Sequence, residues 1–227
     1  MSDDKAGILY LVATPIGNLG DISARALATL RQVSAVVCED TRVTAKLLQH
    51  YDIKQLTLSF HHHSSEAVSG ALIVRLKAGE SLAYVSDAGT PGIADPGGKL
   101  VAAAANAGVR VIPIPGPSAV TTALSVAGLP TQRYLFLGFP PHKKGRQTFF
   151  KEVAFCPYAV VFYESTHRIT KTLTGLAKLI PLRQLVVGRE LTKHFETIYR
   201  GTSGAVLEQL VHTSTKGEFV IIVAPSK

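Results

Sequence analysis

Short apolar runs alternate with segments of helical periodicity through the first half of the sequence, and this alternation most restricts its fold. We expect strands at the apolar runs 8–13, 35–39, 56–60, 81–86 and 109–114. Helices are expected from Ser23 onward and over 44–51, 66–77 and 99–107. Parallel strands that are covered on both faces are continuously apolar, as these runs are. The pattern therefore predicts an α/β domain of βαβ units around a mostly parallel sheet.

The segment 113–117 holds three prolines and a glycine, so no regular element is expected across it. We place a domain boundary there, with an N-terminal α/β domain over 1–115 and a C-terminal α/β domain over 116–227. In the second domain we expect strands at 133–139, 159–163, 185–189 and 218–223, and helices at 118–126, 169–179 and 205–211. Lys216 and Gly217 before the last strand suggest a hairpin, and with it a mixed sheet.

Composition narrows the class of protein. Hydrophobic residues make up 46% of the 227 residues, which excludes intrinsic disorder, and no apolar run is long enough for a transmembrane helix. The acidic N-terminus does not resemble a signal peptide. Cys38 and Cys156 lie in apolar runs, so we expect buried thiols in a reducing cytoplasm. The net charge of +8 favours a polyanionic partner such as nucleic acid, although basic surfaces also occur without one.

Three loops rich in glycine and proline follow strands, at the edge where α/β sheets bind ligands. The first, 14–21, matches no standard phosphate-binding motif. It is equally consistent with a ligand-binding loop and with an ordinary tight turn. The second, 86–98, is unusually long; Asp87 is placed to accept hydrogen bonds from ribose hydroxyls, and Asp95 to cap the next helix. In the third, 115–119, Ser118 either caps a helix or leaves room for an adenine or carboxylate. Together the loops predict a nucleotide-like pocket between two domains.

Several polar clusters offer further candidates. Residues 39–42 end a strand at the same edge, where a carboxylate either serves as a general base or pairs with Arg42. Residues 61–63 are consecutive histidines, whose side chains alternate between faces in a strand, so no metal site is expected. The basic residues Lys143, Lys144 and Arg146 form either a solvated surface or a site for RNA phosphates.

Six segments resemble one known family: 9–21, 39–42, 86–91, 115–119, 162–168 and 189–193. They are similar, in the same order, to segments of the ribosomal RNA small subunit methyltransferase I family of the tetrapyrrole methylases. The resemblance extends from Ile8 to Val223. It implies a two-domain tetrapyrrole-methylase-like fold, with a mostly parallel N-terminal sheet, a mixed C-terminal sheet and a ligand cleft between the domains.

The resemblance also implies an activity. A family member transfers a methyl group from S-adenosyl-L-methionine to the ribose 2′-oxygen of a cytidine in the decoding region of 16S rRNA. A cytoplasmic homodimer acting on the small ribosomal subunit is implied as well. Relatives often continue with a small C-terminal segment; if that segment helps to bind RNA, we expect weaker RNA binding here and unchanged cofactor binding. Carried over by position, the cofactor-binding residues are Pro15, Asp87, Ile93, Ser118, Ala119, Phe162 and Leu191.

For the chemistry, we expect a direct displacement in which a carboxylate accepts the proton of the ribose hydroxyl. The candidate bases are Asp40 and Glu164, with Arg42 and Arg168 orienting them or binding phosphate, and the sequence does not choose between the two. Two other functions stay open. One is a methylase of a tetrapyrrole or of a modified protein side chain. The other is a non-catalytic RNA-binding protein, which would explain the basic loop and leave the three ligand-type loops unexplained.

Overall fold

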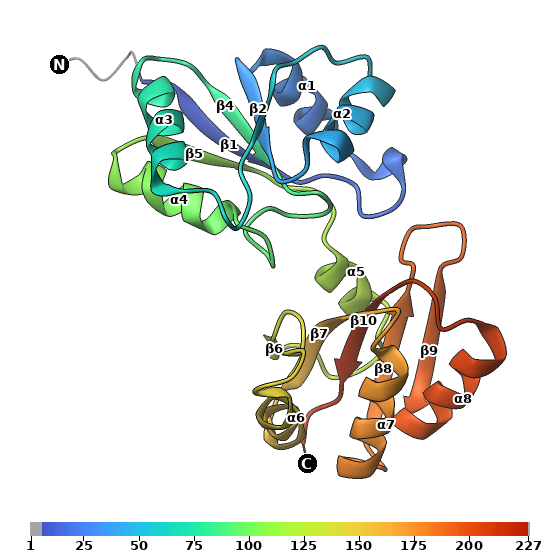
Figure 1. Ribbon diagram of the computed structural model, residues 1–227. Coiled ribbons are helices and arrows are strands. Elements are labelled where there is room, and N and C mark those ends of the chain that lie inside the picture. The colour runs from blue at the N-terminus through green and yellow to red at the C-terminus, as the bar shows by residue number, and fades with distance from the viewer. Residues whose placement is uncertain (1–5, 227) are drawn as a thin grey trace. The chain divides into compact units, whose positions relative to one another are not determined.

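A computed structural model describes residues 6–226 and divides the chain into two compact units (Figure 1). Unit 1 extends to Ser118 and unit 2 begins at Ala119. Each unit has a five-stranded sheet covered by helices. In the described part of the chain, no helix combines the length and the apolar character that crossing a membrane requires.

The sheet of unit 1 is entirely parallel, in the strand order β3-β2-β4-β1-β5. All residues of β2 and β4 are buried, as expected of strands covered on both faces. The expected parallel sheet is thus confirmed. Its strands are β1 (Ile8–Val12), β2 (Ala35–Cys38), β3 (Thr57–Ser59), β4 (Leu82–Val85) and β5 (Arg110–Ile114).

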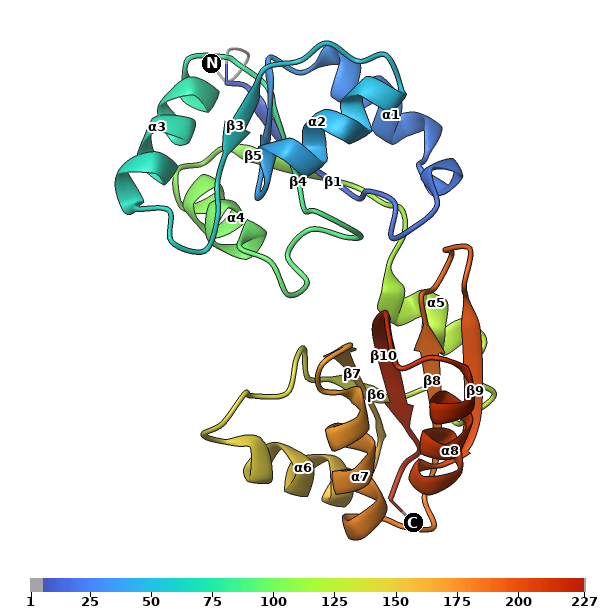
Figure 2. The ribbon, with the colours of Figure 1, turned by 45° about the vertical axis from the view of Figure 1, so that its right-hand side comes forward.

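Helices cover both faces of this sheet (Figure 2). Alternate strand residues supply two separate cores: Val37 belongs to the core with Leu76 and Leu100, and Val36 belongs to the core with Leu30 and Leu48. The helices are α1 (Ala24–Gln32), α2 (Thr41–His50), α3 (Glu66–Lys77) and α4 (Gly97–Asn106), with a short 3₁₀ turn, η1 (Leu19–Asp21), before α1. This arrangement leaves the carboxyl ends of the strands and the loops that follow them at one edge.

The sheet of unit 2 is mixed, as expected, with the order β6-β7-β10-β8-β9. Strands β6 (Tyr134–Phe136) and β7 (Ala159–Ser165) are parallel. Strand β10 (Glu218–Val223) runs antiparallel between β7 and β8 (Gln184–Arg189), and β9 (Thr197–Thr202) is antiparallel to β8. The helices are α5 (Ala119–Ser125), α6 (Arg146–Phe155), α7 (Ile169–Leu179) and α8 (Ser203–Thr213).

The structure differs from the sequence-based expectation at three places in unit 2. Helix α6 and strand β9 were not expected. The hairpin expected at Lys216–Gly217 is wrong, because α8 comes directly before β10 and the hairpin joins β8 to β9 instead. The sheet is therefore mixed for a different reason: β10 inserts between two strands that run opposite to it.

Candidate functional site

Three loops at the carboxyl edge of the unit 1 sheet are hydrogen-bonded to one another. Thr14, after β1, and Gly89, after β4, exchange two backbone hydrogen bonds of 3.0 Å. The Thr14 hydroxyl also donates to the Ser86 carbonyl at 3.2 Å. The Thr90 hydroxyl donates to the carbonyl of Pro117, after β5, at 3.0 Å. These bonds make one connected surface of segments far apart in the sequence.

Two glycines allow the loops to approach so closely. Gly89 has a φ of +83°, and a Cβ added there would lie 3.3 Å from Cγ2 of Ile16. A Cβ at Gly116 would lie 3.0 Å from the Cβ of Ala13, closer than ordinary packing allows. The loops therefore pack backbone against backbone at this edge, with Gly89 buried and Gly116 exposed, and neither contact has room for a side chain.

Asp95 organises the loop after β4. Its carboxylate accepts hydrogen bonds from the backbone N–H groups of Gly92 at 2.7 Å, Ile93 at 3.1 Å and Gly97 at 2.7 Å. The Tyr84 hydroxyl donates a fourth at 3.2 Å. The N-cap of α4 is Pro96, and Asp95, one residue earlier, accepts the N–H of Gly97, the first residue of the helix. Ile93 is left partly exposed on the turn.

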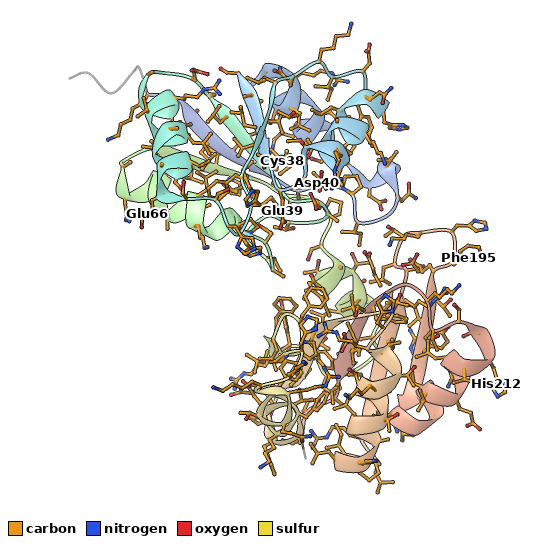
Figure 3. The ribbon with its side chains drawn as sticks, in the orientation of Figure 1. Cys38, Glu39, Asp40, Glu66, Phe195 and His212 are labelled. Atoms are coloured by element: carbon orange, nitrogen blue, oxygen red, sulfur yellow. The ribbon has the colours of Figure 1, made fainter. Side chains whose placement is uncertain are left out.

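Carboxylates gather at the same edge. The backbone N–H of Asp40, after β2, donates to Oδ1 of Asp87, after β4, at 3.1 Å. Burial, followed by the negative charges of Asp40 and Asp95, raises the pKa of Asp87. Burial and the charge of Asp87 likewise raise the pKa of Glu39, which lies beside Cys38 and Asp40 at the end of β2 (Figure 3). Carboxylates with a raised pKa at a ligand-type edge are functional candidates.

Asp40 is held differently from its neighbours. It caps α2 by accepting the backbone N–H of Arg42 at 2.8 Å, and the Arg42 guanidinium donates to both its oxygens, at 3.0 and 2.6 Å. The hydrogen bonds from Arg42 lower the pKa of Asp40 to about 2. A carboxylate with so low a pKa is a weak proton acceptor, which argues against Asp40 as the general base. The Arg42 side chain is 86% exposed, so its guanidinium is accessible from solvent while it binds Asp40.

The remaining candidates for cofactor binding divide between the two units. Pro15, Asp87, Ile93 and Ser118 lie on the connected loops of unit 1, and Ala119 begins α5. Phe162 lies fully buried within β7, where its ring packs edge-on against Phe149 at 5.3 Å. The Phe162 side chain is therefore part of the core of unit 2, and its role in cofactor binding stays a prediction.

Leu191 is also buried, and its side chain packs over Gly188. It has at most a small surface for a ligand. The ligand position between the two domains, expected from the sequence, stays a prediction.

Glu164 and its partners form a buried ionic cluster in unit 2. The Glu164 side chain is fully buried; Oε1 lies 2.8 Å from Nε of Arg168, and Oε2 accepts the Thr172 hydroxyl at 2.6 Å. Nη2 of Arg146 donates to the Thr172 hydroxyl at 2.6 Å and lies 3.8 Å from Oε2 of Glu164. A base must reach its substrate, so this position does not suit Glu164 as the general base.

The structure of this cluster contradicts the RNA-binding role expected for Arg146 and places Arg168 in a structural ion pair. Arg146 is buried with its guanidinium bound inside the protein, so it does not form part of an RNA-binding surface. Arg168 forms an ion pair with Glu164 within this structural cluster. Lys143 and Lys144 are exposed. Thr172 was missed by the sequence analysis, although a polar residue on the apolar face of α7, next to Ile169 and Leu173, is a detectable signal.

Comparisons with known proteins agree with this architecture. A family model described as tetrapyrrole (corrin/porphyrin) methylases matches residues 8–207. The chain is 50% identical over 221 residues to a ribosomal RNA small subunit methyltransferase I from Xylella fastidiosa, covering 96% of this chain and 81% of the relative.

Two solved structures share the fold. A cobalt precorrin-4 methyltransferase matches with a TM-score of 0.72 at 18% identity, covering 96% of this chain and 94% of the other. A uroporphyrin-III C-methyltransferase from Thermus thermophilus, complexed with S-adenosylhomocysteine, matches with a TM-score of 0.65 at 19% identity, covering 95% and 97%.

Proposed function

The chain belongs to the tetrapyrrole (corrin/porphyrin) methylase family and, within it, to the ribosomal RNA small subunit methyltransferase I group, and from this premise we propose that it methylates 16S rRNA. The acceptor is the ribose 2′-oxygen of a cytidine in the decoding region, and the methyl donor is S-adenosyl-L-methionine. The near-complete match to a relative of that name carries the proposal. The connected loops of unit 1 support it, because four of the six segments that resemble the family, 9–21, 39–42, 86–91 and 115–119, meet at the sheet edge.

The residues of this edge fit S-adenosyl-L-methionine, which supplies an activated methyl group when bound. Asp87 offers a carboxylate just after the end of β4, suited to the ribose hydroxyls of the nucleoside. Pro15, Ile93, Ser118 and Ala119 offer small or apolar contacts on or next to the loops that Gly89 and Gly116 allow to approach closely. Asp95 holds the loop that carries Ile93.

Glu39 is the residue that we propose as the proton acceptor. It directly follows the buried strand β2 at the ligand edge, and its raised pKa makes it a better base than Asp40. Asp40 then has the role of orienting Arg42, whose exposed guanidinium is available to an RNA phosphate.

The RNA is proposed to contact Lys143 and Lys144, and the net charge of +8 favours its approach. We further propose that the enzyme acts in the cytoplasm, as a homodimer, on the assembled small ribosomal subunit. The two free, buried cysteines are typical of a reducing compartment. Light scattering of the purified protein tests the dimer.

The test of the function is a methyl-transfer assay with tritiated S-adenosyl-L-methionine and parallel acceptors. Small ribosomal subunits that lack the modification, naked 16S rRNA and a tetrapyrrole are incubated separately with the protein. Label in RNA supports the proposal, and more label in the subunit than in naked RNA supports recognition of assembled structure. Label in the tetrapyrrole alone would replace the proposal with the second candidate, which the shared fold of tetrapyrrole methyltransferases favours.

A further inference from the structure

The loop 137–145, between β6 and α6, leaves the carboxyl end of the parallel pair β6 and β7. The chain first continues along β7, since the N–H of Leu137 donates to Val161 at 3.0 Å and that of Tyr163 donates to Gly138 at 2.8 Å. Gly138 then adopts a φ of +63° and turns the chain away from the sheet. The next residue, Phe139, is 52% exposed.

The Phe139 ring is supported from within the protein. It lies 5.2 Å from the Tyr163 ring, which in turn packs edge-on against Phe136 at 5.0 Å. Burial raises the pKa of Tyr163 to about 12, so this supporting ring stays neutral. Phe139 therefore presents a held aromatic surface to solvent instead of a freely rotating side chain.

The buried ionic cluster fixes the backbone that follows Phe139. Nη1 of Arg168 donates to the Pro140 carbonyl at 2.8 Å, and Nη1 of Arg146 donates to the Pro141 carbonyl at 3.3 Å. Both guanidinium groups are held by Glu164, directly or through Thr172. Burying a carboxylate with two guanidinium groups costs desolvation free energy. Here the cluster positions the carbonyls of two consecutive residues of one surface loop, Pro140 and Pro141.

The loop also carries positive charge. His142, Lys143 and Lys144 are exposed, and the segment 137–145 contains neither Asp nor Glu. A held aromatic ring on the same loop as two exposed lysines is an arrangement by which proteins bind single-stranded nucleic acid: the ring stacks on a base and the lysines meet phosphates. In a duplex the base faces are covered by their neighbours, so a stacking residue of this kind favours unpaired RNA.

We propose that loop 137–145 binds unpaired RNA, with a base stacked on Phe139, phosphates held by Lys143 and Lys144, and Glu164 acting as the positioning residue of the loop. The inference rests on the proposed function and states which feature of the RNA the protein recognises. It assigns RNA binding to Phe139, and it explains the Glu164 cluster as the group that holds the backbone of the loop in place.

Fluorescence anisotropy with the full chain tests the proposal. The probes are a labelled single-stranded RNA of about 12 nucleotides, enough to span such a loop, and the same strand in a duplex. We expect tighter binding to the single strand, and a loss of about tenfold in Phe139→Ala for the single strand with little change for the duplex. Phe139→Tyr restores binding. Replacing Lys143 and Lys144 by Gln weakens both complexes and makes binding less dependent on salt.

Phe155→Ala is the matched control, because Phe155 is a 77% exposed phenylalanine at the other end of α6. Unchanged binding in Phe139→Ala, or an equal loss in Phe155→Ala, would overturn the proposal. So would a change of oligomeric state in Phe139→Ala with intact RNA binding, which would make Phe139 a protein contact. Melting temperatures of all variants establish that they are folded.

Methyl transfer by the unmodified protein is measured in parallel. If it labels ribosomal RNA while Phe139→Ala binds the single strand normally, the stacking inference fails and the proposed function stands. If it labels no RNA while Phe139→Ala still loses single-strand binding, the function fails and the RNA-binding loop stands.

Discussion

Thr14 and Gly89, 75 positions apart in the sequence, exchange two backbone hydrogen bonds of 3.0 Å and so join the loops that follow β1 and β4. The joint depends on the left-handed backbone of Gly89 and on the absence of a side chain there. It brings Pro15, Asp87 and Ile93 onto one connected set of loops. The proposed cofactor site therefore depends on this joint.

Gly89→Ala tests the joint. Because the residue has a positive φ and its Cβ would press on Ile16, we expect the free energy of unfolding to fall by about 1 kcal/mol or more. Affinity for S-adenosylhomocysteine should fall as well, measured by calorimetry. Gly98→Ala is the control: a Cβ there meets nothing within 4 Å and the position is helical, so stability should stay constant or rise. Unchanged affinity in Gly89→Ala would show that cofactor binding does not depend on the hydrogen bonds between Thr14 and Gly89.

Asp87→Asn should make the protein more stable and a poorer cofactor binder. The pKa of Asp87 is raised in the folded state, so its contribution to stability is complete below the ordinary carboxyl pKa and is lost as the pH rises through the raised value. At pH 7 the charge is therefore unfavourable, and Asp87→Asn removes it while an amide oxygen remains to accept the Asp40 N–H.

Solvent screening keeps the expected gain in melting temperature small, on the order of 1–2 °C at pH 7 and none below about pH 4. Loss of a charged acceptor should weaken S-adenosylhomocysteine binding by about tenfold or more. A melting temperature that falls at pH 7, or unaltered binding, would contradict the role given to Asp87.

Glu39→Gln should slow the chemical step without affecting cofactor binding. Removal of a positioned base typically lowers a rate by about 10²-fold or more. The measurement is single-turnover methylation at saturating cofactor, with calorimetry as the check on binding. Asp40→Asn serves as the comparison, because Asp40 is already held as an anion by Arg42. If Asp40→Asn loses more rate than Glu39→Gln, the assignment of the base is reversed.

Glu164→Ala should destabilise unit 2 strongly. It leaves the buried Arg146 and the partly buried Arg168 without their carboxylate, and breaking a buried pair from one side costs about 3–5 kcal/mol of unfolding free energy. Urea denaturation followed by circular dichroism measures the loss. Glu152→Gln, on the exposed face of α6, is the control and should stay within about 0.5 kcal/mol of the unmodified protein. A loss that small in Glu164→Ala would show that the cluster is not structural.

The sequence predicted most elements because buried parallel strands and amphipathic helices are strong local patterns. The bounds of α3, α7 and β10 agree with the expected 66–77, 169–179 and 218–223. Strand β9 has a single buried residue, Tyr199, so its sequence lacks the apolar run of a buried strand. Helix α6 buries Phe149, Phe150, Val153 and Ala154 at helical spacing, a signal that the neighbouring basic loop obscured.

The candidate site was predictable only where local chemistry determined it. Asp95 was expected as a cap because it lies just before a helix, and it does accept the first N–H of α4, although Pro96 occupies the N-cap position. Glu164 and Arg146 were expected at accessible positions because charged residues are usually exposed. Their burial depends on partners from separate elements, Thr172 and Arg168 among them, and no local pattern in one sequence reveals such a pairing.

Nucleoside analysis of the methylated RNA tests the central claim most directly. Small ribosomal subunits lacking the modification are incubated with the protein and tritiated S-adenosyl-L-methionine, and the 16S rRNA is then digested to nucleosides and separated. The account predicts that the label elutes as 2′-O-methylcytidine, from a single position. Label in a base-methylated nucleoside, or RNA without label when the protein demonstrably binds the cofactor, would contradict it.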